Sequence, residues 1–194
     1  YNFTCVKESL FSSVLPYLGI SGYYNPFTAE AHVTKGISIL QRAFVINHEI
    51  AHQLGISSET EANFIAYIAS INNPLTTIQY SGHLILLHYT MGDLYRNEYK
   101  DYQLLVDKIP ENVKKDLNSI NQYWYFYKNE YRKYTDKGYD MFLKANYQKH
   151  GIKSYNRVVS LALSYQKHKN NEKNINTFYN NSWFFHLCNN TEPG

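Results

Sequence analysis

The pentapeptide His48-Glu49-Ile50-Ala51-His52 constrains this chain more than any other feature of its sequence. On an α-helix, residues four positions apart lie on the same face, so the two imidazole rings would approach one point in space. Glu49 follows the first histidine directly, and its carboxylate can reach the neighbourhood of that point. With 8 His in 194 residues, about 0.02 matches to this pattern are expected by chance. The pattern therefore indicates a functional group of side chains on a helix.

The spacing H-E-x-x-H is typical of zinc-dependent hydrolases. It predicts that His48 and His52 bind Zn²⁺ and that Glu49 acts on a water molecule near the metal. The alternative is a pair of hydrogen-bonded histidines in the protein core. That alternative leaves the Glu49 carboxylate without a role on a stretch otherwise made of apolar residues such as Val45 and Ile46. An unpaired carboxylate in apolar surroundings is costly, so the metal interpretation is favoured.

A catalytic zinc site usually has three protein ligands and leaves one position for water. The nearest further carboxylates are Glu59 and Glu61, which follow the turn expected at Gly55. We favour Glu59 as the third ligand. On an ideal helix Glu61 points about 200° away from Glu59, so both cannot bind one ion. The remaining candidates would arrive from elsewhere in the chain, and they are Glu30, His32 and His83.

Other roles are possible for the acidic and polar residues near position 59. Either glutamate could instead only complement the dipole of a helix that begins there. If Glu59 binds the metal, Asn63 lies one helical turn later and is expected to orient it through a hydrogen bond. Glu61 is the other candidate for such a supporting contact. A closed, purely structural zinc site would need a fourth protein ligand, for example Glu30 or His32.

The pattern of apolar residues predicts a mainly helical, α+β chain. Residues 1–26 are expected to form loops around a short helix, and residues 27–39 contain strand-like alternation. One helix is predicted over 40–54. A second begins after Ser57 or Ser58 and ends near 72–74, and a third spans 81–99. A long amphipathic helix follows Pro110, and a last helical segment covers 158–165. The apolar positions of the long helix are Val113, Leu117, Ile120, Trp124, Tyr127, Tyr131 and Tyr134.

Length and composition indicate one domain and exclude several classes of protein. We expect a single domain over residues 1–170 and a polar tail over 171–194. The net charge of +3, with 18% charged residues, is too small and too mixed for a nucleic-acid partner. No apolar run of 18 residues is present. Cys5 and Cys188 lie far apart in the sequence, so they form no metal-binding pair; a disulfide between them or two free thiols both fit.

Beyond these patterns, the chain resembles known families. The combination of residues 48–52 with residues 59–63 is similar to the gluzincin clan of metallopeptidases, which includes thermolysin. In that clan the third ligand belongs to an E-x-x-x-D pattern, which Glu59 and Asn63 match with Asn in place of Asp. A wider set of segments resembles an uncharacterised bacterial family, domain of unknown function 3810. These segments are residues 25–32, 48–55, 59–67, 80–83 and 151–155.

The resemblance implies more than the motif alone. It implies a zincin-like fold with a small β element and a helical C-terminal part. Gluzincins pair an extended peptide substrate with an edge strand ahead of the metal-binding helix, and here Glu30, Ala31 and His32 are the matching positions. Members of the uncharacterised family carry transmembrane helices before this domain. The resemblance therefore implies a membrane-anchored bacterial protein with this domain outside the cytoplasm, and a chain that is one piece of it.

These observations lead to one functional hypothesis with three rivals. The chain is predicted to hydrolyse peptide bonds with Glu49 as the general base. Tyr80 or His83 is predicted to stabilise the negatively charged oxygen that forms during hydrolysis. The rivals are a zinc hydrolase of a non-peptide amide, a metal-binding regulatory module without turnover, and a structural zinc site. The sequence does not indicate the substrate or the oligomeric state.

Overall fold

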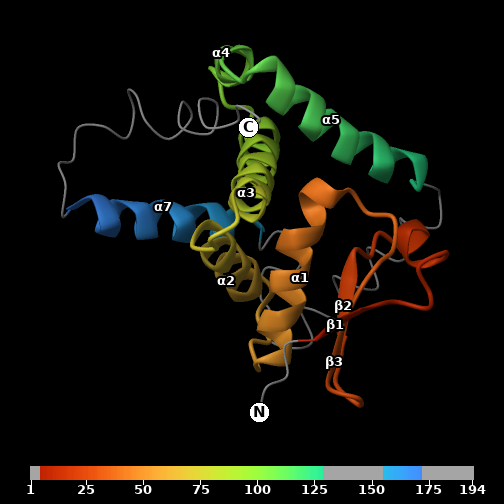
Figure 1. Ribbon diagram of the computed structural model, residues 1–194. Coiled ribbons are helices and arrows are strands. Elements are labelled where there is room, and N and C mark those ends of the chain that lie inside the picture. The colour runs from red at the N-terminus through yellow and green to blue at the C-terminus, as the bar shows by residue number, and fades with distance from the viewer. Residues whose placement is uncertain (1–4, 129–154, 172–194) are drawn as a thin grey trace.

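The computed structural model describes residues 5–128 and 155–171, and within them it has the mainly helical α+β architecture that the sequence predicts. A small sheet comes first along the chain and the helices follow it (Figure 1). The strands are β1 (Val6–Glu8), β2 (Gly22–Asn25) and β3 (Glu30–Val33), with a short 3-10 helix, η1 (Leu15–Leu18), after β1. The helices are α1 (Ile39–Gln53), α2 (Glu59–Ile71), α3 (Thr76–Arg96), α4 (Tyr102–Asp107), α5 (Glu111–Phe126) and α7 (Tyr155–Asn171).

Helix α1 carries the H-E-x-x-H pentapeptide, and its bounds confirm the predicted helix to within one residue. The side chain of Ser38 caps its start by accepting a hydrogen bond from the backbone N–H of Leu40. At its end, Gly55 N–H donates to the carbonyl of His52 and Ile56 N–H donates to the carbonyl of Ala51. This pair of hydrogen bonds is a Schellman turn. It reverses the chain directly after the second histidine.

The next two helices form a hairpin on α1. The side chain of Ser58 caps α2 by accepting from the N–H of Glu61, as one of the two predicted caps. Helix α3 begins at Thr76, earlier than the predicted residue 81. Its apolar register starts only at Leu84, but the turn at residues 72–75 leads the chain directly into a helix. The side chain of Asn73 supports that turn by accepting from the N–H of Leu75.

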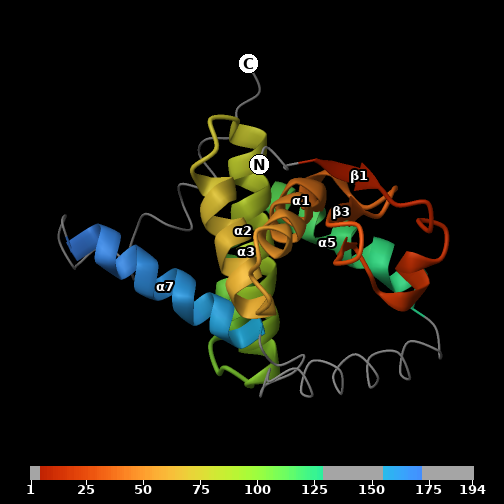
Figure 2. The same cartoon turned by 90° about the horizontal axis from the view of Figure 1, so that it is seen from below.

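The main hydrophobic core lies between α1, α2 and α3, which pack on one another. Helix α7 covers α2 and α3 from the side away from the sheet, and α5 contacts α1 and α3 (Figures 1 and 2). The largest fully buried side chains of this core include Tyr67, Leu84, Leu87, Ile120 and Val158.

Helix α5 confirms the strongest periodic signal of the sequence from Val113 to Trp124, but it ends at Phe126, one residue before the predicted position Tyr127. Val113 and Ile120 are buried, and Leu117 and Trp124 pack against the core. The predicted positions Tyr131 and Tyr134 lie outside the described residues, as do Cys188 and the predicted tail from 172 onward. Helix α4 is the one described helix that the sequence pattern did not predict. None of the described helices is long and apolar enough to cross a membrane.

The sheet has the strand order β1-β3-β2, with β1 parallel and β2 antiparallel to β3. The prediction that Glu30, Ala31 and His32 form an edge strand is therefore wrong, because β3 is hydrogen-bonded on both sides. Apolar alternation identified this segment as a strand, but it carries no information on which strands lie beside it. The edges are β1 and β2. Of these, β2 has more contacts with α1, and α1 separates the sheet from α2 and α3 (Figure 2).

Candidate metal centre

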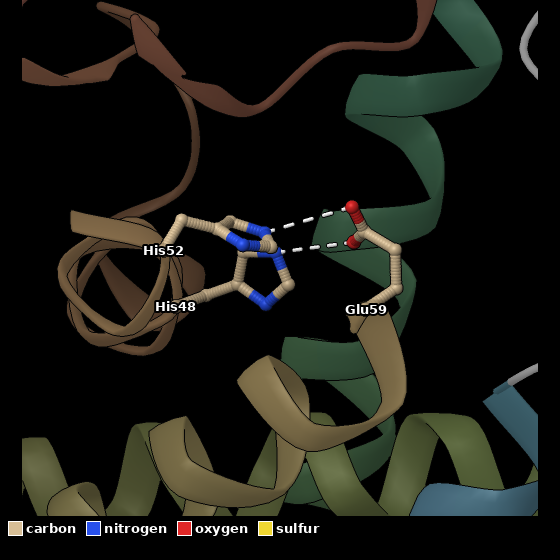
Figure 3. A group of neighbouring side chains, drawn as sticks. All are labelled: His48, His52 and Glu59. Carbon is tan, nitrogen blue, oxygen red and sulfur yellow. Dashed lines mark hydrogen bonds and ion pairs between the residues drawn. The ribbon is translucent and has the colours of Figure 1, made fainter. Parts of the chain in front are cut away.

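Three side chains converge beside the turn between α1 and α2: His48, His52 and Glu59 (Figure 3). The two histidines lie one turn apart on α1, and Glu59 is the first residue of α2. The Nε2 atoms of the histidines are 3.0 Å apart. The carboxylate oxygens of Glu59 lie 3.3 Å from Nε2 of His48 and 3.5 Å from Nε2 of His52. The structure therefore places Glu59 beside the two histidines, at the position predicted for the third member of this group.

The distances between these atoms fit a tetrahedral metal ion. Ligands held about 2.0–2.1 Å from a zinc ion in tetrahedral geometry lie about 3.3–3.4 Å from one another. The two Nε2 atoms are 3.0 Å apart, and each lies 3.3 or 3.5 Å from a different carboxylate oxygen of Glu59, so these separations are close to that value. A group of three electron-pair donors this close needs a cation or a proton between its members. The three side chains therefore form a group that could hold a metal ion, with one ligand atom from each residue within 4.8 Å of the others.

The backbone orients one of the two imidazoles. Nδ1 of His52 lies 2.6 Å from the carbonyl oxygen of Ile56, so Nδ1–H donates to that carbonyl. This bond leaves the lone pair of Nε2 directed at His48 and Glu59. Such a hydrogen bond from the non-binding nitrogen is the usual device that fixes the orientation of a metal-binding histidine. Ile56 is a residue that sequence reasoning missed, because a carbonyl contact has no side-chain signature.

Electrostatics favour an ionised Glu59 in this group. Its side chain is only 17% exposed, and burial alone acts to raise the pKa of its carboxyl. Hydrogen bonds and charge from His48 and His52 outweigh burial and bring this pKa well below its usual range. For His52, burial acts to lower the pKa, but Glu59 and the Ile56 carbonyl raise it. An anionic carboxylate facing two imidazoles is a favourable donor set for a divalent cation.

Glu49 lies between the two histidines in sequence and is buried, with 4% of its surface exposed. Burial raises the pKa of the Glu49 carboxyl to about 7, and the nearby Glu59 acts in the same direction, while His48 and His52 oppose the change. The carboxylate faces strand β2, where Gly22 is its near neighbour. Gly22 is a second residue that sequence reasoning missed. The available signal was a glycine inside the short aromatic segment 21–25, ahead of Pro26.

The remaining predicted site residues have other described contacts. Glu61 is exposed on α2, so it has the position expected for a residue that only complements the helix dipole. The predicted hydrogen bond from Asn63 to Glu59 is absent among the described residues. Instead Asn63 accepts from the hydroxyl of Tyr89 at 3.4 Å, and its Nδ2 has no partner among the described residues.

The two residues predicted to stabilise the oxyanion make contacts between helices. The hydroxyl of Tyr80 donates to the carboxylate of Asp116 on α5. The ring of His83 packs edge to face against Tyr67 on α2, with 5.9 Å between ring centres, and burial lowers the pKa of His83. The roles assigned to Tyr80 and His83 in catalysis remain predictions.

His32 and Glu30 lie on strand β3 of the sheet and do not belong to the group of three. Among the described residues, no fourth His or carboxylate side chain joins that group. The His32 ring stacks on Tyr23, and its Nε2 lies 3.5 Å from Glu30. Glu30 also pairs with Lys7 of β1. The structural zinc site that either residue would have completed is therefore not supported by the described residues.

Comparison with known proteins gives a family whose members have no assigned function. The family model described as "Protein of unknown function (DUF3810)" matches residues 1–163. The matched range includes the sheet, α1 to α5 and the whole group His48, His52 and Glu59. No curated protein and no solved structure matches the chain.

Proposed function

This chain belongs to the DUF3810 family, and we propose that it is a zinc-dependent metallopeptidase. The observation that carries the proposal is the convergence of His48, His52 and Glu59, which bring one ligand atom each to within 4.8 Å of one another. The same helix places a buried carboxylate, Glu49, directly after the first of these ligands. A ligand group and a carboxylate base together are the minimum that hydrolysis of this kind requires.

Zinc is the metal that suits this donor set best. Two neutral imidazoles and one carboxylate are typical of catalytic zinc sites with three protein ligands. Magnesium and calcium prefer sites made wholly of oxygen ligands, and two of the three donors here are nitrogen. Three ligands leave a fourth tetrahedral position open. An open position distinguishes a catalytic site from a closed structural one.

In the proposed reaction, the three metal ligands, Glu49 and Ile56 have different roles. A zinc ion held by His48, His52 and Glu59 would supply Lewis acidity, which polarises a carbonyl group and makes a water molecule easier to deprotonate. Glu49 is the general base: its carboxylate takes the proton of the attacking water and then gives it to the leaving amine nitrogen. The Ile56 carbonyl keeps the His52 ring in its binding orientation.

A peptide is the favoured substrate because an edge strand lies next to Glu49. Thr34 N–H donates to the carbonyl of Ser21, so this pair is a hydrogen-bonded pair of the β2–β3 ladder. In an antiparallel ladder such pairs alternate with non-hydrogen-bonded ones. The backbone groups of Gly22 and Tyr24 therefore point away from β3, toward the edge where β2 has no partner strand among the described residues. An extended peptide could add to the sheet there.

The proposal is tested by metal analysis and peptide-library cleavage of the purified protein and its Glu49→Gln variant. We expect about one zinc ion per chain in both proteins, because Glu49 is not a ligand. Cleavage should fall by at least about 100-fold in Glu49→Gln, since the amide cannot take a proton. A Gln53→Glu variant of the same helix serves as a control for a changed charge outside the ligand group.

Three results would contradict the proposal. Equal cleavage by Glu49→Gln and the parent would remove Glu49 as the base. Zinc binding with no cleavage of any peptide, but with hydrolysis of small amides, would favour an amidase. Zinc binding without turnover of either substrate class would favour a regulatory metal module.

A further inference from the structure

We propose that Gly22 is a positioning residue, whose missing side chain makes room for the Glu49 carboxylate. A Cβ atom added at Gly22 would lie 2.7 Å from Oε1 and 2.9 Å from Cγ of Glu49. Both distances are shorter than carbon atoms tolerate in packed proteins. The inference deepens the proposed function and rests on it for the catalytic consequence, because Glu49 is the base in that proposal.

The opposite side of Gly22 is equally crowded. The added Cβ would lie 2.9 Å from the carbonyl oxygen of His32 on the neighbouring strand. Gly22 faces Val33 in the register of the ladder, and the adjoining pairs, Ser21 with Thr34 and Tyr23 with His32, hold β2 against β3. Gly22 therefore fills a narrow space between the backbone of β3 and a side chain of α1.

Of the two groups that crowd Gly22, the Glu49 side chain can move more easily than the backbone carbonyl of His32. The backbone of β3 is held by strands on both of its sides, whereas a glutamate side chain moves by rotation about its own bonds. An alanine at position 22 should therefore displace the Glu49 carboxylate and leave the ligands His48 and His52 in place. Gly22 has no positive φ angle that would itself require glycine, so the cost of alanine comes from the contacts with the Glu49 side chain and the His32 carbonyl.

The chain supplies a matched control in Gly92 on α3. A Cβ at Gly92 meets nothing closer than 3.6 Å, and the nearest atom is the flexible end of Arg96. Both glycines lie inside regular elements, and both become alanine by the addition of one methyl group. Gly92→Ala should leave cleavage unchanged and keep or raise the melting temperature, because alanine is a better helix former than glycine.

The test is a thermal double-mutant cycle on the zinc-loaded protein, with Gly22→Ala, Glu49→Ala and the double variant. Gly22→Ala alone should lower Tm by a few degrees. In the Glu49→Ala background the same change should cost clearly less, because the contacts with Oε1 and Cγ are removed and only the contact with the His32 carbonyl remains. Zinc content should stay at about one ion per chain in all four proteins. For peptide cleavage, Gly22→Ala should lower kcat by at least about tenfold and leave KM within about twofold.

The two proposals fail in different ways. If the Tm losses of Gly22→Ala and Glu49→Ala simply add, the methyl group does not meet the carboxylate and the role of Gly22 is wrong, whatever the protein hydrolyses. If Gly22→Ala raises KM and leaves kcat unchanged, glycine at this position serves substrate binding and not Glu49, and the inference is again overturned. If the parent cleaves no peptide, the proposed function fails, and the Tm cycle still decides whether Gly22 makes room for Glu49.

Discussion

The two sides of the metal centre are built in different ways. On the helical side, the end of α1, the Schellman turn and the start of α2 supply all three candidate ligands from the short span 48–59. On the sheet side, β2 is brought to Glu49 only through its pairing with β3 and the packing of the sheet on α1. Local geometry thus forms the candidate metal site, and long-range pairing places β2, the proposed substrate edge, beside Glu49.

Different interactions therefore determine the geometry of the two sides. The separations of the candidate ligands depend on the spacing of His48 and His52 along α1 and on the tight turn that leads the chain to Glu59. The position of β2 depends on its hydrogen-bonded ladder with β3 and on a small apolar cluster of Val33, Ile37 and Val45. Changes on the helical side should therefore alter metal affinity, and changes on the sheet side should alter turnover.

The largest expected effect belongs to the helical side and compares two glutamates of α2. Glu59→Gln keeps the shape of the side chain and removes the charge of a ligand, so zinc affinity should fall by at least about 100-fold. Loss of an outer partner alone typically costs 10–100-fold. Glu61→Gln changes a carboxylate two positions away that is exposed, and its zinc affinity should stay within about twofold of the parent. Competition with a chelator of known affinity measures both.

The result for these two glutamates can also fail in an informative way. If both variants lost zinc equally, the helix dipole and overall charge would control binding and not coordination by one carboxylate. If only Glu61→Gln lost zinc, the third ligand would be Glu61. The Glu59 group in the structure would then be an ion pair of the metal-free protein.

The helical side could be predicted from the sequence because each step is local. The spacing of His48 and His52 fixes their common face, Gly55 marks the helix end, and Ser58 with Glu59 marks the next start. The structure confirms each of these elements. The carbonyl of Ile56 was missed, since a backbone group contributes to hydrogen bonding at every residue and has no pattern of its own.

The sheet side could not be predicted to the same depth. Alternation in 27–39 indicated a strand, which the structure confirms as β3, but its neighbours are short. Strand β1 has three residues and β2 has four, with Gly22 and two tyrosines that give no clear alternation. Strand order depends on contacts between distant residues, which a single sequence does not encode in any short pattern. The edge was therefore assigned to the wrong strand.

A smaller effect compares two glycines with similar positive φ angles, one on each side. Gly55 has a φ of +97° in the turn before α2, and Gly36 has a φ of +88° between β3 and α1. At both positions an added Cβ meets nothing within 4 Å. Alanine should therefore cost only backbone strain, about 1–2 kcal/mol of unfolding free energy at each site. Only Gly55→Ala should also weaken zinc binding, by several-fold.

The reason for the asymmetry is the place of Gly55 in the chain. It lies between His52 and Ile56, whose hydrogen bond orients the imidazole, and it belongs to the turn that leads the chain into α2 at Glu59. Gly36 contacts none of these groups through the backbone hydrogen bonds that the structure describes. Urea unfolding of the metal-free proteins gives the strain, and chelator competition gives the affinity. Equal losses of affinity in both variants would show that general loosening, and not the local turn, sets the metal site.

The smallest effect concerns the ion pair that joins the two sides. Nη2 of Arg42 on α1 lies 2.7 Å from Oε1 of Glu8 at the end of β1. The side chains are 26% and 49% exposed, so water and salt screen their attraction, and such pairs contribute about 0.2–1 kcal/mol. Glu8→Gln should therefore reduce the unfolding free energy by less than about 1 kcal/mol, and the loss should shrink in high salt. A loss above about 2 kcal/mol, or a change in kcat, would mean that this pair and not the cluster of Val33, Ile37 and Val45 holds the sheet against α1.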